Sequence, residues 1–144
     1  MIAQITGTLI ALEDDRGLVS IGNIAYELLL PGYCIGVLSG KIGTQITLCT
    51  LEYYEGTPGG GNLVPRMLGF MSKAEKDFFS RYTSVQGIGI KKGLKSLCMP
   101  VETIASAIES GDEKLIATMP GIGKRLAQHI IAELKGKLSL FASD

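Results

Sequence analysis

Apolar residues alternate with polar ones through the first half of the chain, a pattern typical of β-strands with one buried face. Turn-forming clusters rich in glycine, asparagine, aspartate or proline separate the alternating stretches. The predicted strands are residues 2–12, 18–21, 24–30, 44–54 and 67–70. Five short strands with frequent turns suggest a small barrel, and the five-stranded oligonucleotide-binding (OB) barrel is one candidate.

Two stretches between these strands are expected to lack regular structure. Pro31-Gly32 stops the third strand, and a short linking turn is predicted to lead to the strand that begins at Thr44. The stretch from Gly56 to Asn62 holds four glycines and Pro58, and it is predicted to form a mobile loop.

From Ser72 onward the apolar residues recur at helical spacing. Ser72 and Glu75 have the spacing of a capping box. The apolar stripe behind them is Ala74, Phe78, Phe79, Tyr82 and Val85. Further predicted helices are 91–97, 101–109, 113–119 and 124–140, punctuated by Pro100, Gly111 and Pro120. We therefore expect an α+β protein with a β-barrel over residues 1–70 and an all-α domain over residues 71–144.

An internal repeat runs through the predicted helical domain. Residues 84–91 align with residues 118–125 at an offset of 34, and each copy contains Gly-Ile-Gly followed by the start of a basic helix. Lys91 and Lys92 follow the first Gly-Ile-Gly, whereas Lys124 and Arg125 follow the second. This repeat is the most informative feature of the sequence.

Each copy of the repeat has the properties of a phosphate-binding turn. Two glycines allow unusual backbone conformations and leave no side chain in the way of an approaching group. The isoleucine between them can fill the gap between the flanking helices. The next helix begins with outward N–H groups and the positive end of its dipole, which suit a phosphate oxygen. A plain inter-helical turn is the alternative, but two copies with cations in register favour a phosphate contact, which would not read base sequence.

The charge distribution supports an anionic partner for the second half of the chain. The protein has 14 basic and 14 acidic residues, 19% of residues are charged and 46% are hydrophobic. Residues 1–64 hold two basic and six acidic residues, and residues 65–144 hold twelve and eight, so the two segments carry formal charges of −4 and +4. Such an asymmetry indicates a polyanion bound by the basic part.

Several other classes of protein are disfavoured. The three cysteines Cys34, Cys49 and Cys98 form no CxxC pair and are expected to be buried thiols. His129 is the only histidine, so neither a metal site nor a serine nucleophile with a histidine base is supported. Neither a Walker loop nor a dinucleotide fingerprint occurs. No apolar run approaches a membrane span and the N-terminus lacks a signal-peptide layout, so we expect a cytoplasmic protein that uses no metal or cofactor.

Taken together, these motifs resemble one protein family. Gly87-Ile88-Gly89 and Pro120-Gly121-Ile122-Gly123-Lys124 are similar to helix-hairpin-helix motifs. Their position behind a barrel resembles the RuvA family of bacterial Holliday-junction proteins, and the resemblance spans nearly the whole chain. Further matching segments are Met1-Ile2 with Gly7, Ala25–Glu27, Leu68–Phe70, Glu75–Phe79 and Ile130–Lys135. The resemblance implies an OB barrel followed by two helix-hairpin-helix motifs.

The resemblance also implies a function. It is that of a non-catalytic DNA-binding subunit, without a cofactor, which forms tetramers or pairs of tetramers. Such a subunit holds a four-way junction open in a square-planar form and recruits the ATPase RuvB for branch migration. The implied DNA-binding residues are Gly87, Ile88, Gly89, Lys91, Lys92, Gly121, Ile122, Gly123, Lys124 and Arg125.

Two family features differ in this chain. The family has an acidic pin, a pair of adjacent carboxylates on a barrel hairpin that helps to part DNA strands. Here the adjacent pair is missing, and Glu55 is the best single candidate. The family also has a linker and a C-terminal domain that binds RuvB, and this chain ends at Ser143-Asp144, about where that linker would begin. Either the sequence is trimmed, or the protein does not recruit the motor in the usual way.

Two alternatives from other classes remain open. One is a generic single-strand or duplex DNA-binding module in which the barrel, and not the hairpins, makes the contacts. The other is a repair nuclease or glycosylase that uses hairpins for docking. The sequence disfavours the second, because no catalytic lysine–aspartate pair with its own domain fits in 144 residues.

Overall fold

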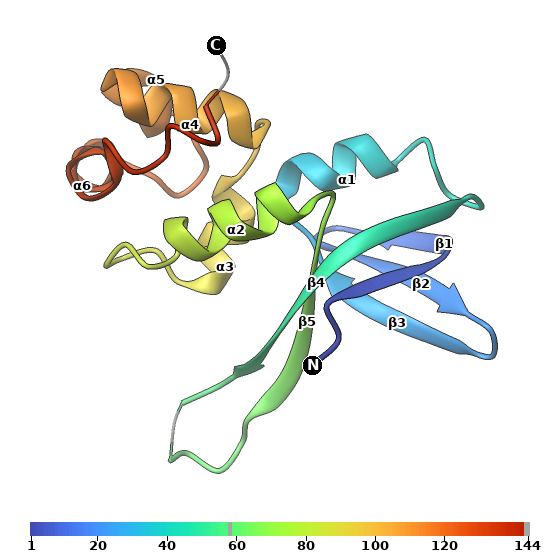
Figure 1. Cartoon of the computed structure of the whole chain (residues 1–144). Coiled ribbons are helices and arrows are strands. Elements are labelled where there is room, and N and C mark those ends of the chain that lie inside the picture. Colours follow the sequence, from blue (N-terminus) through green and yellow to red (C-terminus); the bar gives the residue numbers. More distant parts are fainter. Residues whose placement is uncertain (58, 143–144) are drawn as a thin grey trace. The chain divides into compact units, whose positions relative to one another are not determined.

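The computed structural model describes residues 1–57 and 59–142 and contains a barrel and a helical unit. The chain divides into two compact units, which are described separately below. The first contains Met1–Leu30 and Cys34–Lys73, and the second contains Pro31–Tyr33 and the chain from Ala74 onward. Figure 1 labels the strands and helices of both units.

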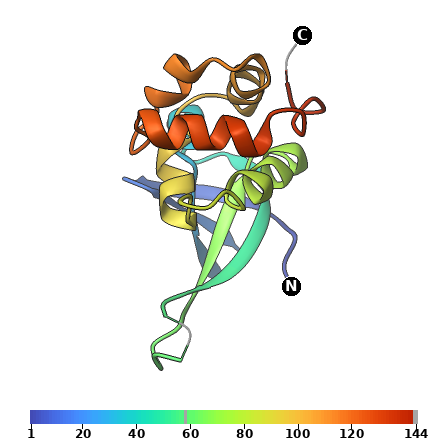
Figure 2. The same ribbon diagram turned by 90° about the vertical axis from the view of Figure 1, so that its left-hand side faces the viewer.

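The first unit is a closed barrel in the strand order β1-β2-β3-β5-β4, which confirms the expected OB barrel. Antiparallel pairing joins all neighbours except β3 and β5, which meet in parallel through the single pair Leu29↔Leu68. Figures 1 and 2 show β4 and β5 running past the other strands as a two-stranded ribbon. The strands are β1 (Gln4–Glu13), β2 (Arg16–Ile21), β3 (Ile24–Leu29), β4 (Gln45–Glu55) and β5 (Val64–Phe70).

Alternation of the strand side chains builds the barrel core. Leu9, Leu28 and Leu68 are fully buried, and they come from three different strands. The register of β1 against β2 shifts between Leu9 and Ala11, so Ile10 lies at a β-bulge and its side chain is 46% exposed. The bulge bends β1, which lets the strand pair with β2 along one part and with β4 along another.

Ion pairs support the weakly paired side of the barrel. Arg66 on β5 binds Glu55 on β4 at 2.6 Å and lies 3.7 Å from Glu27 on β3. Glu27 also accepts from Arg16 on β2 at 3.0 Å. Arg16 in turn donates to Asp15, and this hydrogen bond is the main cause that raises the pKa of the Arg16 guanidinium. The network therefore links four strands across the seam where β3 and β5 share only one residue pair.

The prediction of a linking turn after Pro31 is wrong, because a short helix, α1 (Gly32–Leu38), forms there. Cys34 and Leu38 are fully buried and lie one helical turn apart, and Leu30 one turn earlier is 2% exposed. This spacing of four residues is the helical signal in the sequence. Gly32, Gly36 and Gly40 obscured it, because glycine has a low helix propensity and is typical of turns.

The second unit contains the remaining helices. They are α2 (Lys73–Tyr82), α3 (Ile90–Ser96), α4 (Val101–Ser110), α5 (Glu113–Ala117) and α6 (Lys124–Leu134). Both views place α6 beside α4 and α5 (Figures 1 and 2). The helix expected to run to residue 140 ends at Leu134, because Gly136 adopts a left-handed φ of +89°. Phe141 then returns the chain to the core, with its ring 5.9 Å from that of Phe78.

Three further expectations can be compared with the structure. All three cysteines are free, but only Cys34 is buried, whereas Cys49 is half-buried and Cys98 is exposed. The expectation of buried thiols is therefore confirmed only for Cys34, and it is wrong for Cys98. Over the part of the chain that the structure describes, none of the helices has the length and apolar character needed to cross a membrane. The loop expected at 56–62 contains no helix or strand in its described residues, and Pro58 lies outside them.

Close strand packing at Gly7 gives a prediction for barrel stability. A Cβ added at Gly7 would collide with the Ser20 carbonyl oxygen and lie 2.9 Å from a Val19 methyl group. We expect Gly7→Ala to lower the free energy of unfolding by about 1–3 kcal/mol, measured by urea denaturation. Gly36→Ala is the matched control, because a Cβ there meets nothing within 4 Å and α1 gains helix propensity. Equal urea midpoints for the two variants would contradict this account of Gly7.

Candidate nucleic-acid interface

The two Gly-Ile-Gly turns have the same backbone conformation. The first glycine of each turn is left-handed, with φ of +96° at Gly87 and +78° at Gly121. The second glycine of each is extended, with φ and ψ of −83° and 178° at Gly89 and −92° and −178° at Gly123. The sequence repeat is therefore also a structural repeat. The first position requires glycine because side-chain-bearing residues rarely adopt that conformation.

The isoleucines of both turns belong to the core. Ile88 is 2% exposed and Ile122 is 4% exposed. Their amides close the turns, since Ile88 N–H donates to Val85 O and Ile122 N–H donates to Met119 O, each at 3.0 Å. These two residues thus shape the turns, and their own N–H groups are already used inside the protein.

The amides that follow the isoleucine of the second turn have no backbone acceptor among the described residues. The first helical hydrogen bonds run from Gly93 N–H to Gly89 O at 2.8 Å and from Ala127 N–H to Gly123 O at 2.9 Å. Neither helix has a side-chain cap. Within residues 1–57 and 59–142, the amides of Gly123, Lys124 and Arg125 donate to no backbone carbonyl. They therefore remain available to an external acceptor at the start of the eleven-residue helix α6.

The two turns line one cleft of about 700 Å³. The first turn contributes Gly87 and Lys92, and the second contributes Gly121, Gly123 and the exposed Lys124 and Arg125. The structure thus brings six of the sequence-predicted binding residues together. The cleft-lining residues that the repeat did not single out are Gln86, Leu126 and His129. Gly89 and Lys91 are exposed, but they are not among the described residues that line this cleft.

The hairpins pack on each other reciprocally. A Cβ added at Gly87 would lie 3.3 Å from Cδ1 of Leu126, and one added at Gly121 would lie 3.9 Å from Cγ of Lys92. Gly87 and Gly121 are 34 residues apart, as are Lys92 and Leu126, so the two contacts are equivalent under the repeat. The pair of hairpins therefore has approximate two-fold symmetry.

A buried hydrogen bond positions the first hairpin. The hydroxyl groups of Tyr82 on α2 and Ser96 on α3 lie 2.7 Å apart, and both residues are fully buried. Gly93 permits this close approach of the helices, because a Cβ there would lie 2.8 Å from Thr83 and 3.0 Å from the Phe79 ring. At an offset of 34, Tyr82 and Ser96 correspond to Ile116 and Ile130, which are also fully buried. The second hairpin thus has two buried apolar side chains at the positions of the hydrogen-bonded pair.

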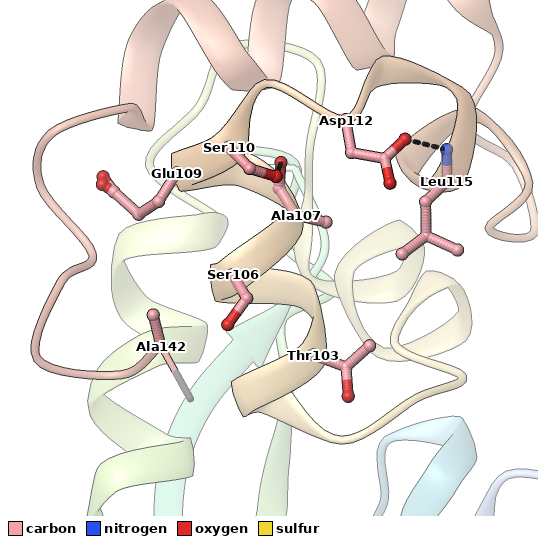
Figure 3. Close-up of a pocket in the computed structure, with 8 residues that line it drawn as sticks. All are labelled: Thr103, Ser106, Ala107, Glu109, Ser110, Asp112, Leu115 and Ala142. Carbon is pink, nitrogen blue, oxygen red and sulfur yellow. Dashed lines mark hydrogen bonds between the residues drawn. The ribbon is translucent and has the colours of Figure 1, made fainter. Parts of the chain in front are cut away.

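A second hollow, of about 650 Å³, lies beside α4 and α5. Figure 3 shows Asp112 pointing at the Leu115 amide, to which it is hydrogen-bonded at 3.1 Å as the N-cap of α5. The neighbouring Ser110 donates to Ala107 O, and the Glu109 carboxylate accepts from Gly136 N–H at 2.8 Å. These polar side chains therefore hydrogen-bond to backbone atoms near helix ends, and we assign the hollow a structural role.

Two further observations concern metal binding and the candidate acidic pin. Among them, no group of three or more His, Cys, Asp or Glu side chains is arranged to hold a metal ion. Glu55, the candidate for the acidic pin, lies at the end of β4 with its side chain 24% exposed and ion-paired to Arg66. Its negative charge is therefore largely compensated within the barrel.

The fold and the cleft define a class of protein, in which an OB barrel precedes a pair of helix-hairpin-helix motifs. A family model described as "SAM-like Helix-hairpin-helix tandem" matches residues 79–137, which include both turns and helices α3 to α6. The match agrees with the reciprocal packing of the two hairpins.

Curated relatives narrow the class further. A protein of Rhodopirellula baltica is 36% identical over 99% of this chain and 69% of its own length. Proteins of Desulfosudis oleivorans and Desulfatibacillum aliphaticivorans are 37% and 34% identical over 68% and 69% of their lengths. All three are named Holliday junction branch migration complex subunit RuvA. The chain belongs to the RuvA family, as its motifs suggested.

Titration of the buried tyrosine predicts a loss of stability at alkaline pH. Burial raises the pKa of Tyr82 from 10.0 to about 12, because the folded state favours the neutral phenol. This stabilisation is complete below pH 10 and is lost as the pH rises from 10 to about 12. We expect urea denaturation to show a steeper fall in the free energy of unfolding for the wild type than for Tyr82→Phe, by up to about 1.4 kcal/mol per pH unit.

The control for this titration is Tyr54→Phe, because the Tyr54 side chain is 70% exposed. This variant should keep the wild-type pH dependence. At pH 8, Tyr82→Phe should lose about 1 kcal/mol through the missing hydrogen bond to Ser96. A Tyr82→Phe variant with the same alkaline profile as the wild type would refute the assignment.

Proposed function

We propose that the protein binds four-way DNA junctions through backbone contacts of its two hairpin turns, as the DNA-binding subunit of a branch migration complex. The observation that carries the proposal is the single cleft lined by both turns and by three cations, Lys92, Lys124 and Arg125. The choice of a four-way junction as the ligand and of a branch migration complex as the assembly rests on the name that the relatives share. A contact of this kind holds phosphates without reading base sequence, which suits a protein that must act on junctions of any sequence.

The proposed contact rests on amides and cations acting on the same phosphate groups. The N–H groups at the start of α6 that have no backbone acceptor among the described residues can donate to phosphate oxygens, and the positive end of the helix dipole favours the negative charge. The glycines leave room for the sugar–phosphate backbone to approach. The proposed DNA-binding residues are Gly87, Ile88, Gly89, Lys91, Lys92, Gly121, Ile122, Gly123, Lys124 and Arg125, with the two isoleucines shaping the turns from the core.

Assembly of several chains would give the protein its selectivity for a four-way junction over a linear duplex. A single backbone-binding module binds DNA with a dissociation constant of about 10⁻⁴–10⁻⁶ M at physiological salt. We propose that residues 1–70 form the core of a homotetramer, or of a face-to-face octamer, and that residues 71–144 present the hairpins to the four arms. Four linked contacts then gain affinity through effective concentration, which a linear duplex does not provide.

The remaining parts of the proposal concern chemistry, partners and location. We infer that the chain binds DNA without catalysing a reaction, needs no cofactor, and acts in the cytoplasm with the ATPase RuvB as the motor. The relatives' naming as complex subunits supports this role. Glu55 would contribute to strand separation only weakly, because Arg66 binds its carboxylate.

Alanine at the second glycine of each turn tests the hairpin contact without disturbing the fold. A Cβ at Gly89 or Gly123 meets nothing within 4 Å, and the backbone there is open to any residue. We expect Gly89→Ala and Gly123→Ala to change the stability by less than about 1 kcal/mol. Each should weaken binding to a synthetic four-way junction by about tenfold, in fluorescence anisotropy, because the methyl group occupies the path of the phosphate.

Gly40→Ala is the matched control for both substitutions, because a Cβ at Gly40 also meets nothing within 4 Å. It should leave junction binding unchanged. Unaltered affinity in the Gly89→Ala/Gly123→Ala double variant would show that the hairpin turns are not the contact, and would favour binding by the barrel.

Junction preference and salt dependence test the proposed ligand. We expect a four-way junction to bind about a hundredfold more tightly than a linear duplex of equal length, because four arms are engaged together. The logarithm of the association constant should fall linearly with the logarithm of the salt concentration, with a slope of about −0.9 for each phosphate contact. Equal affinity for the two DNAs would exclude junction recognition, and cleavage of either DNA would point to a repair enzyme.

A further inference from the structure

The two hairpins share a backbone but not a set of charges. Positions equivalent under the 34-residue offset are Ile90 and Lys124, Lys91 and Arg125, and Lys92 and Leu126. Lys92 and Leu126 both line the cleft, whereas of the other two pairs only Lys124 and Arg125 line it. Three cations do so, and two of them, Lys124 and Arg125, belong to the second turn.

The third cation, Lys92, crosses from the first hairpin to the second. Its Cγ lies 3.9 Å from the point where a Cβ on Gly121 would be, so its aliphatic stem packs over the first glycine of the other turn. Leu126 makes the equivalent contact in the opposite direction, with Cδ1 3.3 Å from such a point at Gly87. Lys92 thus occupies a packing position that the other repeat fills with leucine.

Packing of the stem leaves the ammonium group to the cleft. Long basic side chains commonly bury their methylene groups and keep the charged end in water. Lys92 is exposed as a residue and lines the cleft. Among the residues that the structure describes, no carboxylate forms a salt bridge with it, so its charge is available to an external anion.

We propose that Lys92 contacts the DNA phosphate held by the second turn, although the sequence places Lys92 in the first hairpin. This inference rests on the proposed function, and it specifies at which turn Lys92 contacts the DNA. The phosphate at the second turn is then held by Lys92, Lys124 and Arg125 together, whereas the first turn keeps only Lys91, which does not line the cleft. The hairpin pair, which is symmetric in its backbone, thus contacts DNA phosphates unequally at its two turns.

Lys92→Leu is the sharpest variant for testing this role. It installs the residue that the second repeat has at the equivalent position, so the packing on Gly121 should be kept while the charge is lost. We expect junction affinity to fall by about tenfold and the salt slope to decrease by about one for each chain bound. Lys92→Arg should retain most of the affinity, and an unchanged urea midpoint would show that the fold is intact.

A double-mutant cycle identifies the turn on which Lys92 acts. Residues that share one contact give non-additive effects, whereas independent sites give additive ones. We expect Lys92→Leu to have little further effect in a Gly123→Ala background, where the phosphate at the second turn is already displaced. In a Gly89→Ala background it should retain its full tenfold effect, by the same additivity argument.

The outcomes of the cycle are distinct. Coupling of Lys92→Leu to Gly89→Ala, with additivity toward Gly123→Ala, would assign Lys92 to its own hairpin and overturn the inference. Wild-type affinity in the Lys92→Leu variant would also overturn it, with the proposed function intact. Failure of the wild-type protein to bind junction or duplex DNA would instead overturn the proposed function, and the inference with it.

Discussion

The contact of each hairpin with the first glycine of the other is the constraint on which the interface depends. Gly87 and Gly121 adopt left-handed conformations, and the space where a Cβ would point is occupied by Leu126 and bordered by the stem of Lys92. The glycines therefore have a conformational role and a packing role at the same position. Because both contacts are reciprocal, they bring two turns that are 34 residues apart in sequence to one cleft.

The helical unit keeps a symmetric backbone while its side chains diverge. Val85 and Met119 accept the turn-closing hydrogen bonds, and Ile88 and Ile122 fill the core in the same way in both copies. The polar pair Tyr82–Ser96 holds the first hairpin, and an isoleucine pair takes its place in the second. The repeated backbone accommodates either buried pair. The hydroxyl groups of the first pair are hydrogen-bonded, and the second pair has no polar side-chain group to satisfy.

In the barrel unit, side-chain ion pairs as well as backbone strand pairing hold the barrel closed. Only Leu29 and Leu68 pair between β3 and β5, so the backbone provides little support at this seam. Arg66 spans it through its contacts with Glu55 and Glu27. The ion pair with Arg66 largely compensates the negative charge of Glu55, so here a structural requirement opposes the role suggested by the family pattern.

The sequence by itself determined the strands, the order of the helices and the conformation of both turns, because alternation, helical spacing and Gly-Ile-Gly act through neighbouring residues. It missed α1, whose glycines resemble a turn, and it extended α6 past Gly136. Only the tertiary structure decided that both turns line one cleft, that Arg66 binds Glu55, and that Lys92 lies against the opposite hairpin. These contacts join residues distant along the chain, and no local pattern specifies which side of a helix such a partner will cover.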